Sequence, residues 1–326
     1  MKDYIIGENE AGQRLDKYLG KLLREAPAGF YYKMLRKKNI TLNGRKASGA
    51  EILGQGDHIR LFLSEETIRK FQAAAPVIQA CGRLDIIYED DDFLFANKPV
   101  GLLSVPDGKG GSSLTEELTA YLLNKGSLTR EEMAVFQPSV CSRLDRNTSG
   151  ITAAGKTLRA LQELSAAIKE HRIRKEYLAL AAGKITEERR ISAYLDKNPK
   201  TNMAVISDRP LGKDSVRIET AYRPVQANGE CTLLEVELVT GKFHQIRAQL
   251  ASLGHPLVGD TKYGDPGLNR IYRDKYGLRS QFLHAYRLTF LKDTIPEEAL
   301  LSRLSGKVLQ ADLPGLFQRI LQDQKW

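Results

Sequence analysis

The stretch 231–256 changes its hydrophobic period within a few residues, and this limits the fold more than any other feature of the chain. Leu234, Val236 and Leu238 alternate with glutamates, which is the pattern of a strand with one buried face. Beyond a glycine, apolar residues recur at helical spacing over residues 244–253, and a glycine and a proline then end the helix. This stretch therefore predicts a strand that leads directly into a helix.

Other strand-like and helix-like segments follow from residue 83 to the C-terminus. The apolar periods predict strands at residues 86–88, 93–96 and 176–180, and helices at residues 113–122 and 158–168. These elements are mixed without a regular strand–helix–strand repeat. We therefore expect an α+β domain with a mixed, largely antiparallel sheet.

The first 64 residues predict a separate small α/β unit. Leu15 and Leu22 lie on one face of a helix, and residues 30–38 form a second helix with Tyr32 and Leu35 facing inward. An Asn-Gly pair predicts a hairpin at residues 41–45, and a strand follows at 59–63. Residues 65–82 show no clear apolar period and include Ala73-Ala74-Ala75-Pro76, so we predict a linker there. The domains are then expected at 1–64 and 83–326.

Length and charge agree with two domains and a polyanionic partner. The chain has 326 residues and a net charge of +9, and 42% of its residues are apolar, which is enough for a substantial core. A basic balance favours nucleic acid as the partner. The alternative is a basic enzyme whose charge only aids solubility, and charge alone does not separate the two.

Cysteine usage and motifs argue against several classes of protein. The three cysteines are far apart and form no CxxC pair, so neither a disulfide framework nor a zinc site is expected. The chain has no phosphate-binding loop, no dinucleotide fingerprint and no metal-ligand pattern, so we expect no metal and no cofactor, nucleotide cofactors included. It shows neither a signal-peptide pattern nor a membrane span, which predicts a cytoplasmic protein without membrane contact.

The segment 143–150 reads RLDRNTSG and carries the candidate catalytic residue, Asp145. A glycine at position 150 permits a sharp turn, and Arg143 and Arg146 flank the carboxylate and favour its ionised form. An ionised aspartate on a tight loop can serve as a nucleophile or a base. Arg-Leu-Asp also occurs at 14–16 and 83–85, but without the Thr-Ser-Gly that follows here, and we interpret those copies as surface charge pairs. The alternative for Asp145 is a carboxylate that only stabilises its loop.

Three motifs occur in order: NKPVGL at 97–102, RLDRNTSG at 143–150 and TGKFHQIR at 240–247. Together they resemble the RluA-type pseudouridine synthases, which isomerise uridine in structured RNA. The resemblance implies that Asp145 is the nucleophile and that Arg247 pairs with it. It implies that Tyr177 stacks on the base and takes part in removing the C5 proton.

The resemblance also implies RNA contacts. Arg143 matches the residue that fills the space left by a flipped base, whose extrusion costs a few kcal/mol. His244 and Gln245 are expected to contact RNA or to form hydrogen bonds at the helix start. The N-terminal unit resembles the S4-like RNA-binding module, which implies phosphate contacts for its basic cluster, namely Lys33, Arg36, Lys37 and Lys38. A solvated helix face is the alternative for this cluster.

Two positions depart from the family pattern, since Ser142 stands where many members carry His and Lys242 where Arg is common. Lys98 is either structural or directed at phosphate, and attack at C6 of the base or at C1′ of the sugar stays open. We expect a monomer that acts on large-subunit ribosomal RNA, with transfer RNA as the second choice. Two other classes stay open: a non-catalytic RNA-binding or ribosome-assembly protein, and a glycoside or nucleoside hydrolase with paired carboxylates.

Overall fold

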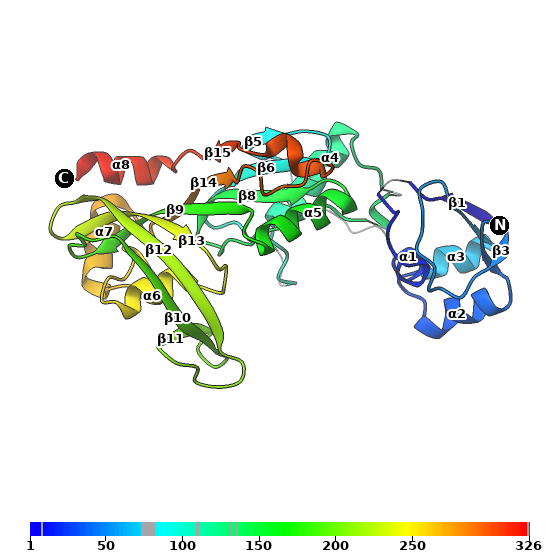
Figure 1. Ribbon diagram of the computed structural model, residues 1–326, viewed down its shortest axis with the longest axis horizontal. Coiled ribbons are helices and arrows are strands. Elements are labelled where there is room, and N and C mark those ends of the chain that lie inside the picture. The colour runs from blue at the N-terminus through cyan, green and yellow to red at the C-terminus, as the bar shows by residue number, and fades with distance from the viewer. Residues whose placement is uncertain (8, 73–81, 109–110, 131, 135, 325) are drawn as a thin grey trace. The chain divides into compact units, whose positions relative to one another are not determined.

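The structure is a computed structural model of the chain, and it describes every residue except 8, 73–81, 109–110, 131, 135 and 325 (Figure 1). The chain forms two compact units. The first comprises Met1–Arg83, Thr115–Ser139 and Gly155–Gln162, and the second comprises Leu84–Leu114, Val140–Ala154 and Glu163–Trp326. None of the helices in the described part is both long and apolar enough to cross a bilayer.

The N-terminal part of the first unit is a four-stranded antiparallel sheet with three helices. In chain order the elements are β1 (Lys2–Ile5), α1 (Leu15–Leu22), α2 (Ala28–Arg36), β2 (Ile40–Leu42), β3 (Arg45–Lys46), β4 (His58–Leu61) and α3 (Glu65–Phe71). The strands lie in the order β1-β4-β2-β3. The predicted first helix, hairpin and last strand are confirmed, and Leu15 and Leu22 lie in the core.

Several details of this region differ from the predictions, and β1 was not predicted at all. Helix α2 covers residues 28–36 and not 30–38, and Tyr32 is 39% exposed where an inward position was predicted. Helix α3 occupies the start of the predicted linker, because Ser64 caps it and Ile68 is buried in the core of the N-terminal part. A helix with a single buried residue has too weak a period to be recognised. The predicted Ala73-Ala74-Ala75-Pro76 break lies outside the described residues.

The larger sheet has eleven strands and confirms the α+β prediction. The strands are β5 (Ile86–Glu89), β6 (Phe93–Lys98), β7 (Ser139–Val140), β8 (Ser149–Gly155), β9 (Ile173–Ala182), β10 (Arg189–Asn198), β11 (Met203–Ser207), β12 (Val216–Ala227), β13 (Cys231–Leu238), β14 (Leu283–Phe290) and β15 (Val308–Gln310). The main order is β11-β10-β12-β13-β9-β14-β8-β6-β5. Pairings from β11 to β14 are antiparallel, and β14 pairs with β8 in parallel.

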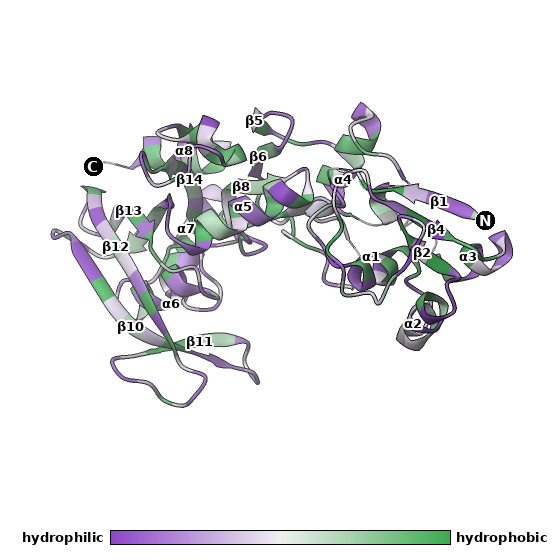
Figure 2. Ribbon diagram, turned by 45° about the vertical axis from the view of Figure 1, so that its right-hand side comes forward, coloured by the Kyte–Doolittle hydropathy of each residue, from purple (hydrophilic) through white to green (hydrophobic). Residues whose placement is uncertain are grey.

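The helices that follow in the chain are α4 (Leu114–Lys125), α5 (Leu158–Lys169), α6 (Gln245–Ser252), α7 (Pro266–Tyr276) and α8 (Gly315–Asp323). The helices predicted at 113–122, 158–168 and 244–253 correspond to α4, α5 and α6, whereas α7 and α8 were not predicted. On β13, Val236 is fully buried and lies opposite Tyr177 of β9, while the glutamates between its apolar residues face the other way. Purple and green bands along β10 and β12 show that hydrophilic and hydrophobic residues are mixed on both strands (Figure 2). Ile246 and Leu250 of α6 pack into the cluster that contains Tyr177.

Gly150 fixes the end of the 143–150 segment against the sheet. Its φ is 114°, which L side chains rarely adopt, and a Cβ placed there would lie 2.1 Å from the carbonyl oxygen of Ala285. Residues 149 and 150 pair with residues 284 and 285 of β14. The predicted turn is therefore anchored at the point where β8 begins.

Candidate active site

Asp145 lies in a small cavity with residues from distant parts of the chain. The cavity, about 50 Å³, is lined among others by Arg143, Tyr177, His244 and Arg247. The guanidinium Nη1 of Arg247 donates to Asp145 Oδ2 at 2.9 Å, and His244 Nε2 lies 3.8 Å from the same oxygen. Asp145 is 28% exposed in its side chain, so the carboxylate stays accessible. The structure thus brings together all three residues that the resemblance made catalytic.

Arg247 joins the candidate nucleophile to a second, fully buried carboxylate. Its Nε and Nη2 donate to Asp260 Oδ2 and Oδ1 at 2.7 and 2.9 Å, a bidentate pair. Burial works against the charge of Arg247, but the hydrogen bond and charge of Asp260, together with Asp145, raise its pKa above the ordinary value. In the same pair, Arg247 outweighs the effect of burial and lowers the pKa of Asp260. Asp260 could not be predicted from the sequence, because no spacing pattern connects it with Arg247.

A buried lysine ties the NKPVGL segment to the Asp145 loop. The ammonium of Lys98 donates to the carbonyl oxygens of Pro99, Leu102 and Arg146 at 2.8–3.1 Å. Its side chain is fully buried, and burial lowers its pKa to about 8, although the negative charge of Asp145 opposes the change. Of the two interpretations of Lys98, the structure supports the structural one.

Further contacts hold the same loop from both sides. Ser104 Oγ donates to the carbonyl of Leu144 at 2.8 Å and lies 3.0 Å from the amide nitrogen of Leu144, which donates back to it. Arg146 Nε donates to the carbonyl of Gly101 at 3.0 Å. Arg146 therefore stabilises the loop. Asp145 pairs with Arg247 of α6, as the resemblance implied, and no ion pair among the described residues joins it to Arg143 or Arg146.

His244 precedes α6 and is held in a left-handed conformation with φ of 53°. Its Nδ1 lies 2.9 Å from the hydroxyl of Tyr263, and its ring stacks on Phe243 with centroids 3.7 Å apart. Burial, opposed by Asp145 and aided by Arg247, lowers the pKa of His244 to about 4, so the ring is neutral at pH 7. Helix α6 starts at Gln245, one residue after the start predicted at residue 244.

Gln245 is buried, and its side chain is fully used at the start of α6. Its Oε1 accepts from Thr240 Oγ1 and the amide of Lys242, and its Nε2 donates to Thr220 and to the carbonyl of Glu219. Of the two expected roles, the structure supports hydrogen bonding at the helix start over contact with RNA.

Tyr177 and Arg143 both line the cavity that contains Asp145. Tyr177 is buried on β9, and burial together with the negative charge of Asp145 raises the pKa of its hydroxyl. The ring is therefore an uncharged phenol at neutral pH. Arg143 is exposed and lines the cavity from the Asp145 loop, so its guanidinium is available to a ligand.

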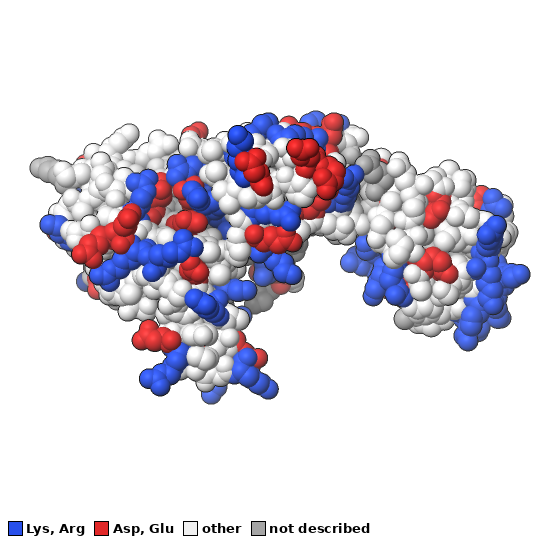
Figure 3. Space-filling model, viewed as in Figure 1, with Lys and Arg blue, Asp and Glu red and all other residues white. Residues whose placement is uncertain are grey.

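The four basic residues at 33 and 36–38 belong to the other unit and are all exposed. Figure 3 shows Lys and Arg side chains gathered at two edges of that unit, with few Asp and Glu between them. This distribution suits contact with a polyanion.

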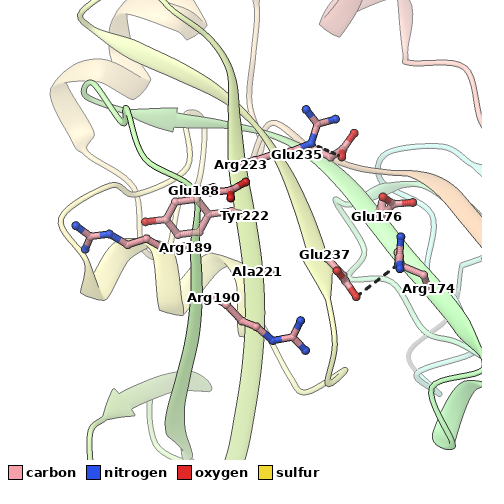
Figure 4. A pocket seen from close by; sticks show the side chains of 10 residues that line it. All are labelled: Arg174, Glu176, Glu188, Arg189, Arg190, Ala221, Tyr222, Arg223, Glu235 and Glu237. Atoms are coloured by element: carbon pink, nitrogen blue, oxygen red, sulfur yellow. Dashed lines mark hydrogen bonds and ion pairs between the residues drawn. The ribbon is translucent and has the colours of Figure 1, made fainter.

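A larger hollow, about 430 Å³, lies on the opposite face of the sheet (Figure 4). Glu176 and Glu237 line it, and they alternate along β9 and β13 with residues of the Tyr177 face. Its arginines are matched by glutamates, as in the pairs Arg174–Glu237 and Arg223–Glu235. It has no excess of either charge, and it does not include Asp145.

Comparisons with known proteins agree with this geometry. The sequence pattern of the family described as RNA pseudouridylate synthase matches residues 92–252. The chain is 31% identical over 324 residues to ribosomal large subunit pseudouridine synthase C of Vibrio cholerae, covering 94% of this chain and 96% of the relative. It is 32% identical over 295 residues to the protein of the same name from Escherichia coli, covering 89% and 88%.

Solved structures show the same fold. Human RNA pseudouridylate synthase domain containing 4 superposes with a TM-score of 0.56 at 19% identity, covering 73% of this chain and 91% of that one. Human RNA pseudouridylate synthase domain containing 1 gives a TM-score of 0.51 at 24% identity, covering 77% and 96%. With a relative 31% identical over almost its whole length, this chain belongs to the RNA pseudouridylate synthase family.

Proposed function

We propose that this protein isomerises uridines of large-subunit ribosomal RNA to pseudouridine, with Asp145 as the nucleophile and without a cofactor. The observation that carries the proposal is the Arg247–Asp145 contact of 2.9 Å in a cavity that also contains Tyr177. Relatives named as ribosomal large subunit pseudouridine synthases cover more than nine-tenths of the chain and support this choice of substrate. We infer that the enzyme acts in the cytoplasm as a monomer, needs no nucleotide cofactor and does not contact membranes.

The reaction conserves all atoms of the nucleotide. The bond between N1 and C1′ breaks, a bond between C5 and C1′ forms, the C5 proton leaves and N1 gains a proton. Asp145 Oδ2 accepts the bond from Arg247, whereas Oδ1 accepts no hydrogen bond from any residue that the structure describes. This second oxygen is therefore the one available for attack at C6 or at C1′, and either route uses the same carboxylate.

The surrounding residues supply substrate binding. Arg143 at the cavity edge replaces the extruded base in its stack, and the ring of Tyr177 contacts the base inside the cavity. The exposed cluster of Lys33, Arg36, Lys37 and Lys38 binds phosphates in an S4-like N-terminal domain, separate from the catalytic domain.

Replacing Asp145 by Asn tests the nucleophile. The amide keeps the shape of the side chain but removes the charge, so we expect pseudouridine formation to become undetectable while RNA affinity changes less than about twofold. Pseudouridine mapping of ribosomal and transfer RNA from cells with and without the gene, complemented with each form, identifies the substrate.

Each alternative has its own outcome. Retained activity of Asp145→Asn removes the nucleophile assignment, and pseudouridines that depend on the gene in transfer RNA alone replace the proposed substrate. Free uracil among the products indicates a hydrolase. Unchanged pseudouridine maps with RNA binding intact indicate a non-catalytic protein.

A further inference from the structure

Two side chains that face Asp145 are held from a single loop, residues 258–264, between α6 and α7. Asp260 grips the guanidinium of Arg247 with two hydrogen bonds of 2.7 and 2.9 Å. Tyr263 places its hydroxyl 2.9 Å from Nδ1 of His244. Its ring also lies 5.3 Å from the guanidinium carbon of Arg247. One short segment therefore contacts both groups that approach Oδ2 of the carboxylate.

The loop is built to stay in one conformation. Gly259 has a φ of 81°, and a Cβ there would lie 2.2 Å from the carbonyl oxygen of Ser280. A Cβ on Gly264 would meet the carbonyl oxygen of Asp260 at the same distance. The side chain of Asn269 bridges the loop, since Oδ1 accepts from the amide of Gly259 and Nδ2 donates to the carbonyl of Asp260. Such close approaches leave little freedom to the carboxylate that holds Arg247.

The hydrogen bonds of Tyr263 determine which nitrogen of His244 carries the proton. The hydroxyl oxygen already accepts from the amide of Ala204 at 2.6 Å. Burial raises the pKa of Tyr263, so its hydroxyl keeps its own proton at neutral pH. Among the described residues, the acceptor within hydrogen-bond distance of that proton is Nδ1 of His244. A neutral imidazole that accepts at Nδ1 carries its proton on Nε2, the nitrogen nearest Asp145.

We propose that the 258–264 loop is the positioning element of the site, with Asp260 fixing Arg247 and Tyr263 fixing His244 so that its Nε2–H points at Asp145. Both donors then act on Oδ2 and leave Oδ1 to the substrate. The 3.8 Å from Nε2 to Oδ2 is longer than a hydrogen bond, and catalytic contacts of this kind often tighten when substrate binds. The functional part of this inference depends on the proposed role of Asp145, whereas the tautomer of His244 does not.

Nitrogen-15 NMR of the full chain labelled at histidine tests the tautomer directly. At pH 7 we expect His244, assigned by its absence in His244→Gln, to show a protonated Nε2 and an unprotonated Nδ1. In Tyr263→Phe the ring is retained but the donor is removed, so the two nitrogens should shift toward an average of both tautomers. A proton on Nδ1 in the wild type, or identical spectra in Tyr263→Phe, would overturn the proposal.

Steady-state kinetics with large-subunit ribosomal RNA test the positioning role. We expect Tyr263→Phe and Asp260→Asn to lower kcat about 10- to 100-fold with little change in KM, because misplaced groups slow the reaction of bound substrate. Tyr276→Phe removes another tyrosine hydroxyl, bonded to Asp323, and Asp265→Asn removes a charge from the cap of α7. These controls should keep full kcat.

The outcomes separate this inference from the proposed function. Full kcat in Tyr263→Phe, or an effect confined to KM, would overturn the positioning role even where Asp145→Asn is inactive. Should Asp260→Asn fail to fold, the Tyr263→Phe kinetics and the wild-type spectrum still decide. If no RNA is isomerised, the predicted tautomer can still be confirmed or rejected from the spectra alone.

Discussion

Asp145 has two carboxylate oxygens in different surroundings. Oδ2 faces Arg247 and His244, and Oδ1 accepts no hydrogen bond from the residues that the structure describes. An arginine held by two carboxylates cannot turn away without leaving a buried charge unpaired, which is costly. Arg247 therefore keeps one orientation, and with it the orientation of Asp145.

Removing the hydroxyl oxygen of Tyr177 tests the role of a single atom. Because burial and Asp145 raise its pKa, this residue acts as a neutral phenol. We expect Tyr177→Phe to keep RNA affinity and to lower kcat by roughly 10²- to 10⁴-fold, the usual contribution of a positioned proton-transfer group. Single-turnover rates at saturating enzyme measure this step. Tyr222→Phe, two strands away on the same face, should leave the rate unchanged, and an equal decrease in both variants would contradict the assignment.

Which residues lie together at the cavity was predictable from the motifs, whereas contacts that depend on the fold were not. The resemblance carried by the three motifs implied that Asp145, Tyr177 and Arg247 work together, and the structure places all three at one cavity. Asp260 and Tyr263 belong to a loop whose contacts arise only when α6 and α7 are packed. From the sequence, Gln245 could either contact RNA or form hydrogen bonds at the helix start. Its four side-chain hydrogen bonds favour the second role.

The apolar patterns of β13 and α6 predicted both elements correctly. Other elements were not predicted. Helix α3 buries one apolar side chain, and β1 is mostly exposed and is held by its pairing with β4. The amphipathic helices α7 and α8 were not identified either. Pairing between distant strands has no local signal, so the parallel contact of β14 with β8 could not be predicted either.

The contact between β8 and β14 depends on a glycine. We expect Gly150→Ala to lower the free energy of unfolding by about 3 kcal/mol or more, because the methyl group meets the Ala285 carbonyl and the backbone has a positive φ. Gly212→Ala is the matched control, since a Cβ there meets nothing within 4 Å. Denaturant unfolding measures the stability of both variants. Equal free energies of unfolding for the two would show that the contact between β8 and β14 tolerates a methyl group at position 150.

The same pair of strands carries a buried histidine that makes folding sensitive to pH. His284 accepts from Ser149 at Nδ1 and donates from Nε2 to the carbonyl of Ala311, and burial lowers its pKa to about 4. Between pH 6.5 and 4 the unfolded chain binds a proton at this residue that the folded chain does not. Through His284, stability therefore falls by about 3 kcal/mol as the pH falls through this window.

Replacing His284 by Gln should reduce the dependence of the free energy of unfolding on pH. Between pH 6.5 and 4 we expect the free energy of unfolding to change less in the variant than in the wild type. The difference corresponds to the one proton that the unfolded wild-type chain binds at His284. His244 has a lowered pKa as well and contributes a slope of the same sign in both proteins. Parallel curves for the two proteins would exclude His284 as a source of acid sensitivity.

For the whole molecule, the affinity for RNA depends either on the net charge of the protein or on where its charged residues lie. The chain carries a net charge of +9, so converting Lys33, Arg36, Lys37 and Lys38 to Ala leaves +5 (9 − 4). If these side chains bind phosphates, affinity for ribosomal RNA falls in the variant. The slope of log K against log salt then becomes shallower by about 1 for each phosphate that is no longer neutralised.

A second variant separates the two explanations, because the same amount of charge is removed elsewhere. The exposed residues Lys184, Arg270, Arg279 and Lys292 lie in the catalytic unit, and their replacement by Ala also leaves +5. We expect the N-terminal variant to show the smaller salt slope and the control to stay close to wild type, with thermal melts confirming that both are folded. Equal slopes in the two variants would mean that the N-terminal cluster contributes only through the overall field of the protein, and its assignment as an RNA-binding surface would then be wrong.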